Sequence, residues 1–183
     1  MDAEFEPSDG VAFAVRLLNT WDELEPDPEC LRDVGFVQRF LARQDFTEAA
    51  RLAGQADVEW LRALRGRLER AWDSPDEETA VAELNTILAG ASAQPWLARA
   101  GGVSEFRYER PGSSIRQFGD ALAARGLLEA IADGLWPRFG RCDAEPCRCV
   151  YIDRTRSRVR RYCCRLCADR AAHQAFRRRR AGS

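Results

Sequence analysis

Residues 142–167 read CDAEPCRCVYIDRTRSRVRRYCCRLC and contain six of the seven cysteines in this 183-residue chain. The seventh, Cys30, stands alone, far from the cluster. The first nine residues are acidic, unlike a secretory signal, so we expect a chain that is not exported and whose thiols stay reduced. Cysteines this closely spaced among arginines indicate a metal site, whereas a set of buried structural thiols would lie within apolar runs.

Two cysteine pairs in this stretch have the spacing of zinc ligands. Cys142-x4-Cys147 and Cys163-x3-Cys167 are separated by 15 residues, enough for a short hairpin. Zinc takes four thiolates at about 2.3 Å in a tetrahedron, and two such pairs brought together supply that geometry. Four thiolates leave no open coordination position, so the spacing predicts one structural Zn²⁺ rather than a catalytic one.

Two further cysteines are alternatives on spacing alone. Cys164-x2-Cys167 is the commoner zinc spacing, so Cys164 competes with Cys163 as a ligand. In the same way, Cys149 could replace Cys147 in the first pair.

The residues around the cysteines predict a hairpin followed by a helix. We expect strands at 150–152 and 160–162, joined by a turn at 155–158. We then expect a helix over 168–180, whose narrow apolar stripe consists of Ala168, Ala171, Ala172, Ala175 and Phe176. Knuckle, hairpin and helix in this order predict a treble-clef-like zinc module. So small a unit has almost no core, so metal ligation, worth about 10 kcal/mol, would keep it folded.

Charge divides the chain near residue 137. Residues 138–183 contain 14 arginines and four acidic residues, a net charge of +10, whereas residues 1–137 contain 14 arginines and 25 acidic residues, a net charge of −11. We therefore expect two domains, 1–137 and 138–183, with different partners. The opposite charges also allow the acidic domain to fold back over the basic one and shield it.

Residues 1–137 predict a helical domain with one short β element. Apolar residues recur at helical spacing, with N-caps expected at Asp27 and at Ser74. Residues 105–109 alternate with the period of a strand, and a long helix is expected over 114–135. Gly126 lies inside that helix and should weaken it by about 1 kcal/mol relative to alanine. The predicted fold class is thus mainly α.

Several classes of protein are excluded by composition. Apolar runs are interrupted by charge every few residues, so no stretch approaches the roughly 18 apolar residues of a membrane span. We expect a cytoplasmic protein. His173 is the only histidine, which leaves no Ser-His-Asp or Cys-His catalytic set, so we expect no enzymatic activity. Its position on the predicted helix favours a side chain facing solvent or phosphate rather than metal.

Five features of the tail occur in the order of a known zinc finger motif. They are Cys142-x4-Cys147, Tyr151-Ile152-Asp153, Arg156, Arg160-Arg161-Tyr162-Cys163 and Cys167-Ala168-Asp169-Arg170. Together they resemble the CGNR-type zinc finger of bacteria over residues 141–180. The resemblance implies the ligands Cys142, Cys147, Cys163 and Cys167, because in that family the ligand directly follows the aromatic residue. Ala168 and Asp169 depart from the family's Gly and Asn, and a negative Asp169 would oppose phosphate binding unless it pairs with Arg170 or caps the helix.

The N-terminal part resembles the ABATE domain, which precedes the finger in that family and is described as a stress-induced transcription regulator. The resemblance rests on residues 13–20, which end in Leu18-Asn19-Thr20. It implies a zinc-binding, DNA-binding transcriptional regulator whose helical domain senses a signal or a partner. Asn19 and Thr20 become candidates for a ligand or partner site, with a small-molecule effector or a second copy of the chain as the expected partner.

Basic and polar side chains of the tail are candidates for contact with duplex DNA. They are Arg154, Arg156, Arg158, Arg160, Arg161, Arg170, His173, Gln174, Arg177 and Arg178. Four thiolates and one Zn²⁺ together add −2, so the tail keeps a net charge near +8, which favours polyphosphate binding through counterion release. Two other functions stay open: a thiol-based redox sensor in which oxidation of Cys149 or Cys164 releases zinc, and an RNA-binding accessory protein.

Overall fold

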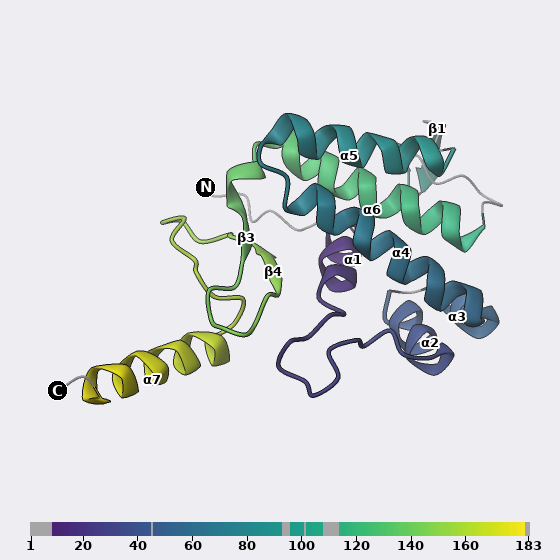
Figure 1. The fold of residues 1–183 in the computed structure, drawn as a ribbon. Coiled ribbons are helices and arrows are strands. Elements are labelled where there is room, and N and C mark those ends of the chain that lie inside the picture. The colour runs from purple at the N-terminus through teal and green to yellow at the C-terminus, as the bar shows by residue number, and fades with distance from the viewer. Residues whose placement is uncertain (1–8, 45, 93–95, 101, 108–113, 182–183) are drawn as a thin grey trace.

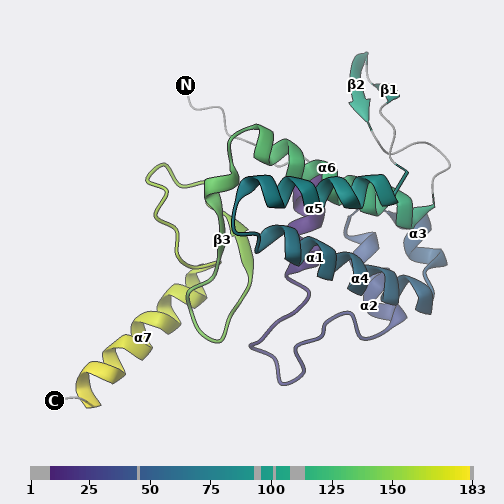
Figure 2. The ribbon, with the colours of Figure 1, turned by 45° about the horizontal axis from the view of Figure 1, so that its top comes forward.

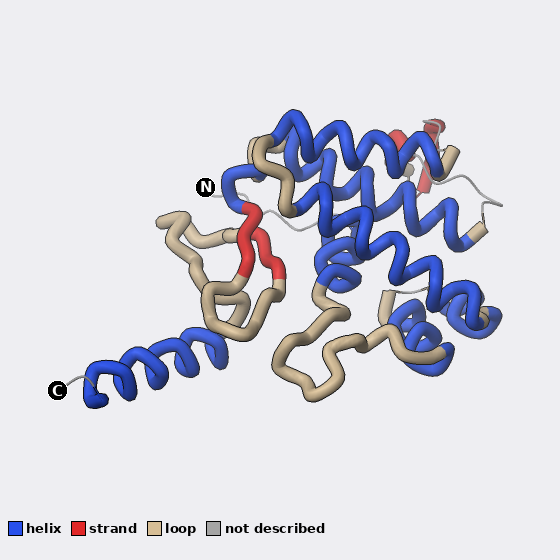
Figure 3. Tube along the Cα trace, in the orientation of Figure 1, coloured by secondary structure: helices blue, strands red, loops and turns tan. Residues whose placement is uncertain are grey.

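The structure is a computed structural model that describes residues 9–44, 46–92, 96–100, 102–107 and 114–181. In chain order its elements are α1 (Asp9–Leu18), α2 (Val34–Ala42), α3 (Thr47–Leu52), α4 (Gln55–Trp72), α5 (Glu77–Gly90), β1 (Trp96–Ala100), β2 (Val103–Arg107), α6 (Ile115–Ala132), the 3₁₀ turn η1 (Trp136–Arg138), β3 (Phe139–Arg141), β4 (Val150–Ile152) and α7 (Arg165–Ala181). Within the described ranges the fold is mainly helical, as the sequence predicts (Figure 3). None of these helices is long and apolar enough to cross a membrane.

Helices α4, α5 and α6 pack side by side, and α1 crosses them, so their apolar faces form one core (Figure 1). Leu17, Leu61 and Leu127 come from three of these helices and are almost fully buried. Helices α1 and α6 approach closely, because a Cβ on Gly126 would lie only 2.3 Å from the carbonyl carbon of Gly10. The glycine that the sequence marks as a weak point of the helix is therefore what allows this helix crossing.

Two helices begin later than the sequence predicts. Helix α2 is capped by Asp33, whose carboxylate accepts a hydrogen bond of 2.8 Å from the Phe36 N–H, so the N-cap expected at Asp27 is wrong. Asp27 instead lies in the loop before α2, where its carboxylate pairs with Arg32 at 3.2 Å, and Arg65 of α4 binds the nearby Glu29. Helix α5 is capped by Asp76, and the N-cap expected at Ser74 is also wrong, because its hydroxyl donates to the Arg70 carbonyl at the end of α4.

The predicted strand at 105–109 is confirmed for residues 105–107, which belong to β2, and residues 108–109 lie outside the described ranges. Its antiparallel partner is β1, in which Trp96 pairs with Arg107. Helix α6 follows, as predicted. Its N-cap is Ser114, and it ends at Ala132, three residues before the predicted end.

The C-terminal hairpin consists of β3 and β4, paired as Phe139 with Ile152 and Arg141 with Val150. The return strand predicted at 160–162 is wrong: this segment lies beside β4, where the Tyr151 hydroxyl donates to the Arg160 carbonyl at 2.7 Å, but it forms no strand. Val150 and Ile152 belong to the same hydrophobic core as the helices of the N-terminal part. The hairpin therefore packs against the helical domain and shares its core.

Helix α7 leaves the hairpin and is directed away from the helical domain (Figures 1 and 2). The apolar stripe predicted on this helix does not pack against other residues beyond the first turns. Ala172 and Ala175 are exposed, and Phe176 is 51% exposed. The expectation that the acidic domain shields the basic tail does not hold for this helix. The body meets the tail instead at the base of the hairpin, where Arg141 forms an ion pair of 2.6 Å with Asp73.

Candidate metal centre and nucleic-acid interface

Four cysteine thiols meet between the β3–β4 loop and the start of α7. The Sγ atoms of Cys142, Cys147, Cys163 and Cys167 all lie within 4.8 Å of one another. The Sγ atom of Cys163 lies 3.7 Å from that of Cys147 and 3.5 Å from that of Cys167. A tetrahedron with metal–sulfur bonds of about 2.3 Å has sulfur–sulfur edges of roughly 3.8 Å, so the cluster fits a zinc-sized ion.

Local backbone structure positions these thiols. Cys142 directly follows β3, and Cys147 is held by a turn in which its N–H donates to the Ala144 carbonyl at 2.8 Å. Cys163 precedes α7 and Cys167 lies in its first turn. The N–H of Cys163 points at the Cys142 sulfur at 3.4 Å, a contact that stabilises a thiolate. The first sequence pair therefore comes from the β3–β4 loop and the second from the start of α7.

The two alternative cysteines lie outside the four-sulfur cluster. Cys164 is exposed to solvent beside Cys163, and Cys149 lines a cleft against α1. Among the described residues, the group that could hold a metal ion contains neither of them. The geometry therefore favours Cys163 over Cys164 and Cys147 over Cys149.

Burial raises the pKa of two of the four thiols. Burial, together with hydrogen bonds from neighbouring thiols, raises the pKa of Cys163 and raises that of Cys167 to about 12. A divalent cation reverses this effect because it stabilises the thiolates directly. The guanidinium of Arg170 adds a further positive contact, since one of its N–H groups donates to the Cys167 sulfur at 3.1 Å. Arg170 thus belongs to the support of the metal centre.

Asp153 organises the arginine-rich turn that follows β4. Its carboxylate accepts hydrogen bonds from the backbone N–H groups of Thr155 at 2.8 Å and Arg160 at 2.9 Å. Burial alone would raise the pKa of Asp153, but these hydrogen bonds lower it overall and keep the carboxylate charged. Asp153, which directly follows the predicted strand, therefore holds the two ends of the turn together.

The structure divides the predicted nucleic-acid residues into two groups. The exposed group consists of Arg154, Arg156, Arg158, Arg161, His173, Arg177 and Arg178. Three others contact the finger itself: Arg170 on the Cys167 sulfur, Gln174 on the Glu145 carbonyl at 3.4 Å, and Arg160 on the Tyr162 carbonyl at 2.9 Å. Arg161 also pairs with Asp143 at 2.9 Å, and Asp169 pairs weakly with Arg165 at 3.9 Å rather than with Arg170.

Asn19 and Thr20, the candidate ligand or partner residues, make contacts within the chain. The Asn19 amide bonds to the backbone of Val150 in β4. Thr20 is buried, and its hydroxyl oxygen accepts a hydrogen bond of 2.8 Å from Arg65. Asn19 thus binds the finger, and Thr20 binds α4.

Sequence reasoning missed two contacts that join the body to the finger. The rings of Trp72 and Phe139 stack with centroids 4.5 Å apart, and Asp73 forms the ion pair with Arg141. Both residues of the body lie at the end of α4. An aromatic residue followed by an acidic one at the end of a helix, Trp72-Asp73, is a weak sequence signal that could have indicated an interface.

Comparison with known families matches both halves of the chain. Residues 12–136 match the ABATE family, described as "Putative stress-induced transcription regulator", and residues 138–180 match the CGNR zinc finger. No curated protein matches the chain. The finger match covers the four-cysteine cluster and most of α7. The chain belongs to the ABATE family and carries a CGNR zinc finger after its helical domain.

Proposed function

We propose that this protein is a DNA-binding regulator whose finger is folded by one structural Zn²⁺. The observation that carries the proposal is the orientation of α7, which extends away from the helical domain with Arg177–Arg180 all exposed (Figure 2). A helix presented in this way can enter the major groove or follow a phosphate backbone. The description of the ABATE family as a transcription regulator supports the same conclusion.

Zinc is the metal best suited to four closely spaced thiolates. Cys142, Cys147, Cys163 and Cys167 would hold it, and four protein ligands leave no position for a substrate. The ion would join the β3–β4 loop to α7, whose shared apolar cluster contains, besides cysteines, only Ala144, Tyr162 and Ala171 among the described residues. Its role is thus to fix the direction in which α7 leaves the finger.

The charge of the finger supports binding to duplex DNA. Residues 138–183 carry a net charge of +10 before the metal and its thiolates are counted. Exposed arginines lie both on the turn, at Arg156 and Arg158, and on α7, so phosphate contacts can form at two places. Each phosphate contact releases counterions, and binding should therefore weaken steeply with salt.

The test is fluorescence anisotropy of a labelled random-sequence duplex with the full-length, zinc-loaded protein. We expect binding that falls at least tenfold between about 50 mM and 200 mM salt. The double variant Arg177→Ala/Arg178→Ala should bind more weakly, and the slope of log K against log salt should decrease by up to about two. Arg51→Ala, which changes an exposed arginine paired with Glu48 on α3, is the matched control and should bind as the unmodified protein does.

Two results would refute the proposal. The first is the absence of salt-sensitive duplex binding by zinc-loaded protein at about 50 mM salt. The second is tighter binding to a structured RNA hairpin than to the duplex at equal salt, which would indicate an RNA-binding protein.

A further inference from the structure

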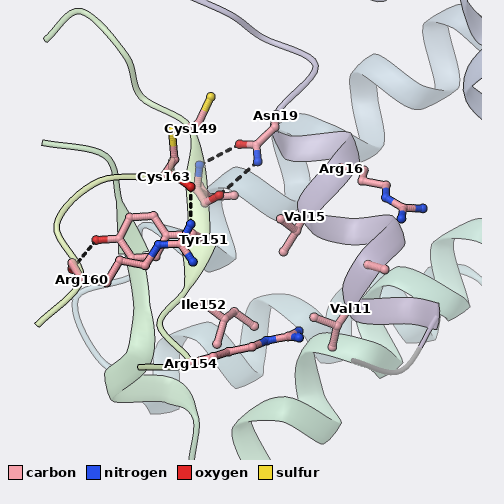
Figure 4. Close-up of a pocket in the computed structure, with 12 residues that line it drawn as sticks. Val11, Val15, Arg16, Asn19, Cys149, Tyr151, Ile152, Arg154, Arg160 and Cys163 are labelled. Carbon is pink, nitrogen blue, oxygen red and sulfur yellow. Dashed lines mark hydrogen bonds between the residues drawn. The ribbon is translucent and has the colours of Figure 1, made fainter. Parts of the chain in front are cut away.

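A cleft of about 470 Å³ lies between α1 and β4, where the helical domain meets the finger. Figure 4 shows its two walls, with Val11 and Val15 on α1 and Tyr151 and Ile152 on β4. This volume lies within the roughly 300–1,000 Å³ of small-molecule sites, which often occur at domain junctions. The cleft is separate from the exposed arginines of α7.

The cleft combines an apolar floor with positive charge. Arg160 lies across the Tyr151 ring, with its guanidinium carbon 4.6 Å from the ring centroid, and Arg154 runs beneath Ile152 towards Val11 (Figure 4). Arg16 also lines the cleft, but its guanidinium points away and donates to Gln44 at 2.7 Å. Among the described residues that line the cleft, none is acidic. Such a lining attracts an anion that also has an apolar body.

The walls of the cleft are held in place before any ligand binds. Arg160 is fixed by its bond to the Tyr162 carbonyl and by a second bond to the Cys163 carbonyl. Asn19 fixes the distance between α1 and β4 through its two bonds to Val150. A preformed site loses less entropy on binding than a flexible one, which favours affinity for a small molecule.

We propose that this cleft binds a small amphiphilic carboxylate. Its hydrocarbon part packs on Ala12 and Val15, the half-buried apolar side chains that α1 contributes to the cleft, and its carboxylate faces Arg154 and Arg160. Because such a ligand touches α1 and β4 at once, its binding stabilises the docking of the finger on the helical domain. The proposal concerns this cleft alone and does not depend on whether the finger binds DNA.

The test is isothermal titration calorimetry of the full-length, zinc-loaded protein with octanoate as the probe. We expect one octanoate per chain. Octan-1-ol, which lacks the charge, should bind at least about tenfold more weakly, the factor expected when one charge-assisted hydrogen bond is lost. Acetate keeps the carboxylate but lacks the hydrocarbon chain, so it should also bind at least about tenfold more weakly because it buries much less apolar surface.

Three variants locate the binding. Val15→Trp fills the cleft from α1 and Arg154→Gln removes a positive charge from it, so each should weaken octanoate binding about tenfold or more. Arg43→Gln is the matched control: Arg43 lines a different cleft, against α2, and its loss should leave octanoate binding unchanged. Circular dichroism and zinc content report whether each variant folds. If Val15→Trp does not fold, the octanoate affinity of Arg154→Gln alone tests the proposal. The proposal is overturned if octanoate does not bind, if octan-1-ol binds equally well, or if folded Arg154→Gln binds octanoate normally.

Discussion

The side-chain amide of Asn19 forms two hydrogen bonds with the backbone of Val150: its Nδ2 donates to the carbonyl at 3.0 Å, and the Val150 N–H donates to its Oδ1 at 2.7 Å. One edge of β4 pairs with β3, and the amide occupies part of the other edge as a neighbouring strand would. The C-terminal end of α1 thereby recognises the backbone of the finger.

Replacing Asn19 by alanine should destabilise the protein. Both polar groups of Val150 would lose their partner in a partly buried place, so we expect the free energy of unfolding to fall by about 1–3 kcal/mol. Urea unfolding of the zinc-loaded protein measures this. Asn85→Ala, on the exposed face of α5, serves as the control and should change stability by less than about 0.5 kcal/mol. Equal effects of the two variants would show that the amide contact contributes nothing.

Two glycines in helices should respond to alanine in opposite directions. In Gly126→Ala the new Cβ would meet the backbone of Gly10 at 2.3 Å and the Val11 nitrogen at 2.4 Å, which forces α1 and α6 apart and should cost about 1–3 kcal/mol or more. In Gly66→Ala the Cβ has no neighbour within 4 Å, so helix propensity should stabilise α4 by about 0.5–1 kcal/mol. Thermal denaturation compares them, and a stable Gly126→Ala variant would contradict the close crossing.

Adjacent cysteines should differ in their effect on metal content. Cys163→Ser removes one of four sulfurs in the cluster, so the purified variant should carry substoichiometric zinc and lose helical circular dichroism from α7. Cys164→Ser changes an exposed thiol outside the cluster and should keep one zinc per chain. Metal analysis by mass spectrometry distinguishes the two. Loss of zinc in Cys164→Ser with retention in Cys163→Ser would reverse the ligand assignment.

Arg170 should affect zinc more than it affects DNA. Its guanidinium donates to the Cys167 sulfur at 3.1 Å, and loss of such an outer contact typically weakens metal binding by about 10–100-fold. Competition with a chromogenic chelator should detect this loss in Arg170→Ala. Arg177→Ala, one turn or more further along α7 and exposed, should leave zinc affinity unchanged. An unchanged zinc affinity in Arg170→Ala would return this residue to the candidate nucleic-acid surface.

The sequence predicts the local features of the chain, namely its helices and its cysteine pairs. It does not predict the contacts between distant segments. Cysteine spacing predicts two pairs of thiols that meet through short turns, but on spacing alone Cys149 and Cys164 are equally good ligands. The resemblance to the CGNR zinc finger implies the four cysteines that the structure brings together. The strand at 139–141 is three residues long and shows no alternation, so nothing local distinguishes it from 160–162 as the partner of β4. Likewise, Asp27 and Asp33 are both good N-caps, and nothing local shows that Glu29, two residues after Asp27, is bound by Arg65, which lies 36 residues further along the chain.

The common core of the hairpin and the helices sets a limit on how this finger can be moved between proteins. Val150 and Ile152 are 2% and 6% exposed because α1 and its neighbours cover them. A finger grafted onto an unrelated host would present these side chains to water, and a truncated helical domain would be left with an open apolar hollow. A chimeric protein that takes its finger from another chain would therefore fold correctly only if the segment around Asn19 is transferred together with the hairpin that it binds.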